Sequence, residues 1–136
     1  MLARVLICSL ILGTSACCRA RSYEPAPDWL VRYVADMDSQ LRTVNATNGI
    51  DADEAKAIAG VYLVKYLTGC GAPDEAILRD HIWVVSLRLG VAGAKSDRTI
   101  EVDSKRGGVW GLGGPRYGDF DSFHYGVLIE VAREGR

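Results

Sequence analysis

The amino-acid sequence predicts an α+β domain in which two helices pack on one face of a curved antiparallel sheet of four or five strands. Segment 82–89 (IWVVSLRL) supports this fold class because its β-branched and aromatic residues suit the middle of a sheet. Two earlier segments have apolar residues at helical spacing, and later segments have strand patterns divided by glycine turns. With 136 residues, 49% of them hydrophobic, the chain suits one such domain, predicted at residues 28–136.

The central strand has two different faces. Trp83, Val85 and Leu87 share one face, and Ser86 and Arg88 lie on the other. A helix is therefore expected to cover the first face, and the Arg88 end of the second face is expected to meet water.

Two segments before this strand have helical periodicity. In residues 28–44, apolar side chains recur every three or four positions, and Asp28 suits the N-cap. Residues 51–68 form a second predicted helix, because Asp51 and Glu54 resemble a capping box and apolar residues follow at helical spacing. We expect this second helix to cover the apolar face of the central strand.

The remaining segments predict the rest of the sheet. Short alternating segments are separated by turns, and residues 111–121 hold four glycines and a proline, which is typical of a long loop. In the last segment, Tyr125 and Val127 would share one face and His124 would lie on the other. The predicted strands are residues 75–78, 82–89, 99–102, 109–112 and 123–132.

The N-terminus has the pattern of an export signal. Residues 1–4 carry one positive charge, residues 5–13 are apolar, and small residues precede Cys17. The apolar run is too short for a helix across a membrane of about 30 Å. We therefore predict a signal peptide at residues 1–16 and a polar tether at residues 17–27.

Because the small residues end at a cysteine, the segment also resembles a bacterial lipoprotein signal, with Cys17 as the lipidation site. This predicts a periplasmic, lipid-anchored protein of the cell envelope. The alternatives are cleavage after Ala16 or Ala20, which gives a secreted protein, and an uncleaved anchor. If Cys17 is lipidated, Cys18 and Cys70 can form a disulfide in an oxidising compartment, whereas cleavage after Ala20 leaves Cys70 alone.

Composition argues against several classes of function. Sixteen basic and seventeen acidic residues are mixed along the chain and give a net charge of -1, without the basic patch of a nucleic-acid-binding protein. Two histidines and four cysteines lack CxxC or HxxxH spacing, so we expect no metal site and no cofactor.

The sequence offers few catalytic candidates. His81 falls in a predicted hairpin turn and is expected to be solvated. His124 faces solvent in the predicted last strand, or a pocket beside Asp119 and Asp121, where a His-Asp pair could act as a base and its orienting group. No serine or cysteine motif accompanies them, so we assign no catalytic residue and expect a non-enzymatic protein.

Aromatic residues and an arginine around the glycine-rich loop are candidates for contacts with a partner protein, because these residue types are enriched at binding hot spots. The alternative is that the aromatic side chains fold back and close the end of the sheet. The predicted partner-binding residues are Trp110, Arg116, Tyr117, Phe120 and His124.

Three stretches resemble small bacterial domains of the cystatin-like and NTF2-like kind, including PepSY-type modules and above all the NTF2-fold immunity proteins. They are DEAKAIAGVYLVKYLTG, AILRDHIWVV and TIEVDSKRGGVWGL, within residues 51–112. The resemblance implies a cystatin-like or NTF2-like fold and an immunity role, in which the protein neutralises a toxin by covering its site.

These observations favour an exported, lipid-anchored domain that binds another protein through residues 111–123 and their neighbour Trp110. A second hypothesis is a small-ligand-binding or enzymatic NTF2-like pocket that uses His124 and Asp121. A third is a structural lipoprotein of the envelope.

Overall fold

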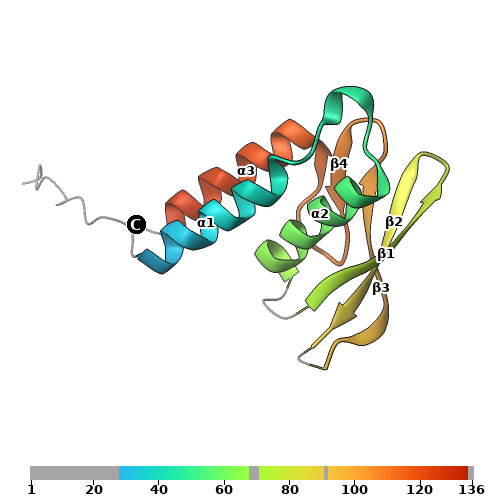
Figure 1. Cartoon of the computed structure of the whole chain (residues 1–136), viewed down its shortest axis with the longest axis horizontal. Helices are drawn as coiled ribbons and strands as arrows, with labels where there is room; N and C mark the ends of the chain where they lie inside the picture. The colour runs from blue at the N-terminus through green and yellow to red at the C-terminus, as the bar shows by residue number, and fades with distance from the viewer. Residues whose placement is uncertain (1–27, 68–70, 91, 135–136) are drawn as a thin grey trace, which may run out of the picture.

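The protein is described from a computed structural model, which places residues 28–67, 71–90 and 92–134 (Figure 1). A five-stranded antiparallel sheet packs with three α-helices, so the predicted α+β class with a curved antiparallel sheet is confirmed. The elements are α1 (Asp28–Leu41), the 3-10 turn η1 (Ala46–Asn48), α2 (Ala52–Tyr62), the π-helical turn η2 (Leu63–Leu67), β1 (Gly71–Arg79), β2 (Ile82–Leu89), β3 (Ala94–Asp103), β4 (Gly107–Trp110), β5 (Tyr117–Asp119) and α3 (Phe120–Glu134).

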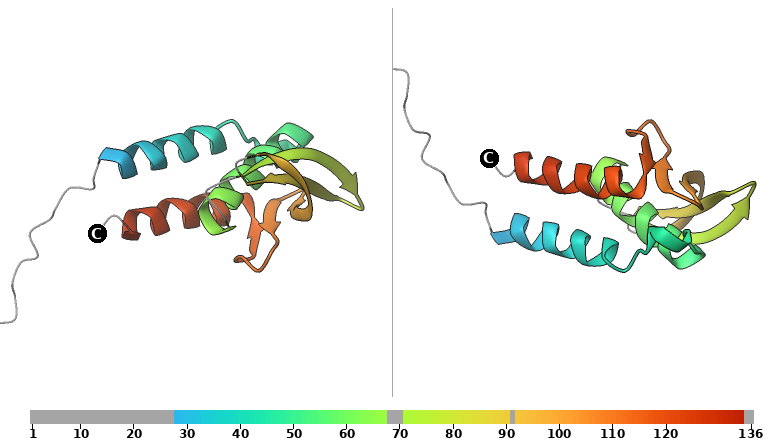
Figure 2. Two further views of the ribbon diagram at one scale, coloured as in Figure 1. Left: turned by 90° about the horizontal axis from the view of Figure 1, so that it is seen from below. Right: turned by 90° about the horizontal axis from the view of Figure 1, so that it is seen from above.

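The sheet is a simple meander in which each strand pairs with the next, in the order β1-β2-β3-β4-β5. The side chains of Val85, Ile100 and Val102 are fully buried on the helix side. Helix α2 contacts the first four strands, while α1 and α3 lie side by side and extend away from the sheet (Figures 1 and 2). Among the described helices, none has the length and apolar character needed to cross a bilayer.

Helix α2 begins as the sequence predicts. The Asp51 carboxylate accepts from the Glu54 N–H at 2.8 Å, and the Glu54 carboxylate accepts from the Asp51 N–H at 2.9 Å. This is the predicted capping box. The helix lies close to β1, since an added Cβ at Gly60 would be 3.3 Å from the Pro73 side chain. The glycine therefore has the packing role that offsets its low helix propensity.

The predicted last strand, residues 123–132, is wrong, because these residues belong to helix α3. Phe123 and Val127 are four residues apart and both fully buried, as one face of a helix requires. The Asp119 carboxylate accepts from the Ser122 N–H at 2.8 Å, which satisfies an exposed amide of the first turn. Tyr125, expected on the core face of a strand, is 68% exposed.

The other differences concern the lengths of elements. Strands β1 and β3 extend beyond the predicted residues 75–78 and 99–102, and the predicted loop 111–121 contains β5. The hairpin turn predicted at residues 79–81 is present but shorter, because Arg79 ends β1 and the turn consists of Asp80 and His81, with φ of 45° and 70°.

Candidate protein-binding face

The sheet has an outer face, formed by the side chains that alternate with the core residues and point away from the helices. One row crosses four strands: Ile77 pairs with Val84, Val84 with Glu101, and Glu101 with Trp110. All four residues are partly or well exposed, in contrast to the fully buried neighbours Val85 and Val102 on the helix side. The described helices therefore leave this face of the sheet open.

Trp110 is the centre of a three-residue unit on the outer face. The Arg116 guanidinium carbon lies 4.4 Å from the centroid of a Trp110 ring, which is a close cation–π contact. At the edge of the ring, the Trp110 indole N–H donates to the Glu101 carboxylate. The unit Glu101–Trp110–Arg116 thus presents an aromatic surface between an anion and a cation.

The loop that carries Arg116 is hydrogen-bonded to the side chain of Tyr62 on α2. The Tyr62 hydroxyl lies 2.9 Å from the Pro115 carbonyl oxygen and 3.1 Å from that of Gly111, and it can donate to either. Burial raises the pKa of Tyr62, so the hydroxyl keeps its proton for this contact. An added Cβ at Gly114 would overlap the Tyr62 hydroxyl. Gly114, in the predicted long loop, therefore allows the loop to approach Tyr62.

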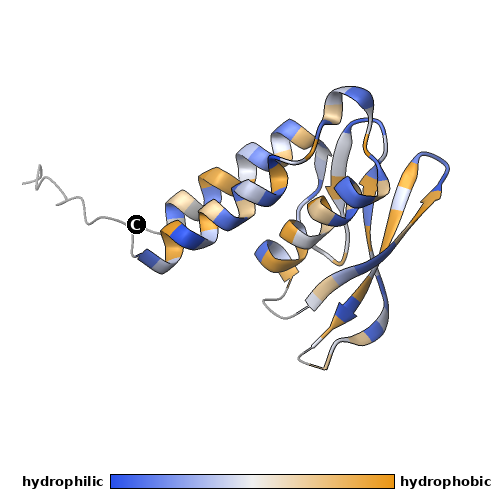
Figure 3. Ribbon diagram, in the orientation of Figure 1, coloured by the Kyte–Doolittle hydropathy of each residue, from blue (hydrophilic) through white to orange (hydrophobic). Residues whose placement is uncertain are grey.

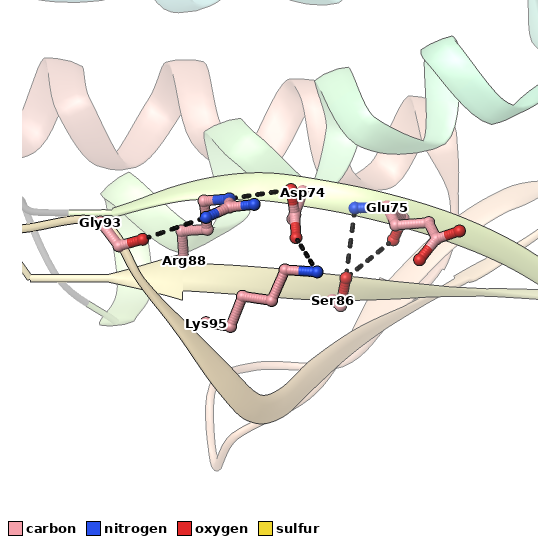
Figure 4. A network of polar contacts seen from close by, with 6 residues as sticks. All are labelled: Asp74, Glu75, Ser86, Arg88, Gly93 and Lys95. Atoms are coloured by element: carbon pink, nitrogen blue, oxygen red, sulfur yellow. Dashed lines mark hydrogen bonds and ion pairs between the residues drawn. The ribbon is translucent and has the colours of Figure 1, made fainter.

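A polar network covers the other end of the outer face (Figure 4). Arg88 Nε donates to the Asp74 carboxylate at 2.9 Å, and Lys95 Nζ lies 3.9 Å from the same carboxylate. The Ser86 hydroxyl bonds both backbone groups of Glu75. Such exposed pairs contribute roughly 0–1 kcal/mol each to stability, so the network mainly gives this surface charges of both signs.

Two of the predicted contact residues contribute to the core: Phe120 is buried and Tyr117 is partly buried. Phe120 is 7% exposed and belongs to the core, and Tyr117 packs edge-on against the fully buried Phe123. The hydroxyls of Tyr117 and Tyr66 are 2.6 Å apart, and burial is the main cause that raises the pKa of Tyr66 well above its usual range. These aromatic side chains close the core, as the alternative interpretation of the loop predicts.

His124 pairs with an acid, but not with the expected one. Its Nε2 lies 2.8 Å from the Asp38 carboxylate on α1, and its ring packs against Phe120. Asp119 instead caps α3, and the hydrogen bond from the Ser122 N–H lowers its pKa. Asp121 is exposed. The expected group of His124 with Asp119 and Asp121 therefore does not form, and His124 joins α3 to α1.

The contact between α1 and α3 should make the free energy of unfolding depend on pH in the acid range. The hydrogen bond from His124, followed by that from Arg42, holds the pKa of Asp38 below its usual 3.8. Because the folded-state pKa is lowered, this stabilisation is complete above about pH 4 and is lost as the pH falls through the folded-state value. We expect Asp38→Asn to reduce the loss of unfolding free energy between pH 4 and pH 2, measured by urea denaturation. An unchanged acid dependence in both Asp38→Asn and His124→Gln would contradict this.

An open cleft of about 400 Å³ lies between the α1–α2 connection, the β3–β4 turn and the start of α3. Its wall includes Asp119 and Asp121, but His124 is absent from it. In the described parts of the chain, no polar or charged residue is fully buried, and no group of three or more acids, histidines or cysteines could hold a metal ion. Of the three residues of the predicted pocket, the cleft therefore brings together Asp119 and Asp121 without His124.

The predicted lipidation site Cys17 and the predicted pair Cys18 and Cys70 fall outside the described residues. The sequence predicts Trp110 and Arg116 as contact residues, but it does not indicate Glu101 beside Trp110 or Val84 beside Glu101. The alternation of the central strand already placed Ser86 and Arg88 on this face, and extending it across the sheet requires the strand register. Comparisons with protein-family models, curated proteins and solved structures found no match.

Proposed function

We propose that this chain is an exported, lipid-anchored protein of the cell envelope that binds another protein and has no enzymatic activity. Its binding surface is the outer face of the sheet, centred on the unit Glu101–Trp110–Arg116. By its resemblance to NTF2-fold immunity proteins, the partner is a toxin that this surface covers.

The open sheet face with its Trp110–Arg116 stack is the observation that carries the proposal. Tryptophan and arginine are the residue types most often found at binding hot spots, and here each holds the other in place. Beyond Glu101, Val84 and Ile77 continue the row with apolar side chains, and further charged residues border it. A central aromatic anchor with a polar rim is the usual arrangement of a protein-protein interface.

The arrangement of helices supports an anchor at the N-terminus. Helix α1 begins at the end of the α1–α3 pair that lies farthest from the sheet (Figures 1 and 2). A 14-residue helix is about 21 Å long. A lipid-anchored tether entering at Asp28 would therefore leave the outer face free to meet a soluble partner.

Substitution of the central pair tests the binding role. In the full-length chain, tagged and captured from envelopes, we expect Trp110→Ala with Arg116→Ala to weaken recovery of the partner by 30-fold or more, as removal of a hot spot of about 2 kcal/mol requires. Tyr125→Ala is the matched control, since it removes an aromatic side chain that is 68% exposed on α3. Equal recovery by the double variant and the control, or no partner in any capture, would reject the proposal.

The anchor is tested separately by metabolic labelling with a radioactive fatty acid. We expect label in the wild-type protein and none in Cys17→Ser, because the lipoprotein pattern places the lipid on this residue and its attachment begins at the Cys17 thiol. Cys18→Ser should keep the label. Label that persists in Cys17→Ser would show that the lipid is attached to another residue, and would contradict Cys17 as the lipidation site.

A further inference from the structure

Strand β1 forms one edge of the sheet, and its two halves differ. The first half contains Pro73 and an irregularity between Pro73 and Ala76, two features that discourage pairing at an edge. The second half, residues 76–79, has neither. Ile77 and Leu78 are 44% and 51% exposed there. Hydrophobic residues follow this hairpin as far as its hydrophilic turn, and the free end stands clear of the helices (Figures 2 and 3).

The backbone of this half is available for pairing. The N–H and C=O of Glu75 are directed to β2, where both bond the Ser86 hydroxyl at 3.2 and 3.3 Å. In an antiparallel strand, successive residues direct their backbone groups to opposite sides. Ala76 and Leu78 therefore present their N–H and C=O groups along the free edge.

The side chains on this edge complement a second copy of themselves. Ile77 and Arg79 lie on the outer face of the sheet, opposite Val84 and Ile82. If two β1 strands pair antiparallel with Ile77 opposite Ile77, then Glu75 of each copy lies opposite Arg79 of the other. Both charged side chains are exposed, and the structure gives neither an ion pair within the described residues.

We propose that two copies of this chain associate through residues 75–79 of β1, with Ile77 on the two-fold axis. The two sheets then form one continuous sheet of ten strands. Ala76 of one copy exchanges backbone hydrogen bonds with Leu78 of the other. Trp110 lies on β4, three strands away from this edge, so each copy keeps its Glu101–Trp110–Arg116 unit open. The pairing thus uses Ile77, at the margin of the proposed partner-binding face, and leaves the centre of that face accessible.

Cysteine substitution tests the register. Ile77 would face its own copy as a non-hydrogen-bonded pair, whose Cα atoms are about 4.5 Å apart, within the range that a disulfide spans. We expect Ile77→Cys in the full-length chain, oxidised mildly in intact envelopes, to give a disulfide-linked dimer on a non-reducing gel. Leu78→Cys, at a more exposed neighbouring position that faces Ala76 instead, should not. The wild-type chain shows what the native cysteines contribute. No dimer with Ile77→Cys, or equal dimer with both variants, would overturn the proposal.

Charge exchange tests the contacts in the Ile77→Cys chain. Glu75→Arg places two pairs of like charges across the two-fold axis, and so does Arg79→Glu. We expect each change alone to slow formation of the disulfide about tenfold, and the two changes together to restore it. A misfolded single variant would not be rescued in this way. Single variants that cross-link at the original rate, or a double variant that stays slow, would contradict the pairing.

Discussion

Replacing Phe123 by alanine is expected to lower the free energy of unfolding by about 3–5 kcal/mol, which is a large share of the 5–15 kcal/mol that stabilises a typical domain. Phe123 is fully buried in the first turn of α3, and its ring packs against Tyr62 and Tyr117. Its removal leaves a cavity where α2, β5 and α3 meet. Equilibrium denaturation in urea, followed by tryptophan fluorescence, measures the loss.

Tyr125→Ala is the matched control for this prediction. The two aromatic residues are only two positions apart, but Tyr125 is 68% exposed. A change at such a surface position usually alters stability by less than about 0.5 kcal/mol. If residues 123–132 formed a strand with Tyr125 on its core face, the order of the two effects would be reversed. A larger loss for Tyr125→Ala would therefore contradict helix α3.

The same residues show why the sequence mispredicts this segment. Tyr125, Val127 and Ile129 alternate with other residues, and β-branched and aromatic side chains favour strands. The pair Phe123 and Val127 fits a helix equally well, since residues four apart share a helical face. Periodicity alone does not decide between the two. Packing of α3 against α1, β4 and β5 decides it, and this packing joins residues far apart in the sequence, such as His124 and Asp38, 86 positions apart.

The sequence could predict those helices and strands that are specified by residues close together in the chain. The capping box of Asp51 and Glu54 determines where α2 begins, and the alternation of the central strand determines its two faces. In the candidate site, residue type indicated Trp110 and Arg116. Whether an aromatic residue lies inside or outside depends instead on strand pairing. Tyr117 is opposite the buried Val109 and points inward, whereas Trp110 is opposite Glu101 and points outward.

The pairing of β4 with β5 should be disrupted by an added side chain at Gly108. An added Cβ at Gly108 would lie 2.7 Å from the Tyr117 carbonyl oxygen and 2.8 Å from Gly118 backbone atoms. Strand backbone cannot yield as a flexible side chain does, so Gly108→Ala must separate the two strands. We expect it to cost about 3 kcal/mol of unfolding free energy, at the upper end for overpacking, measured by the same urea denaturation.

Gly118→Ala provides the control within the same strand pair, because an added Cβ at Gly118 meets nothing within 4 Å. That change should be neutral, or stabilise by less than about 1 kcal/mol through the less flexible unfolded chain. Equal stability of the two variants would contradict the β4–β5 pairing.

The pairing of β4 with β5 also connects the core to the candidate site. Helix α3 follows β5 directly, while the connection between the strands carries Arg116 over Trp110. Gly108→Ala should therefore weaken partner capture together with stability, whereas Trp110→Ala with Arg116→Ala should weaken capture alone.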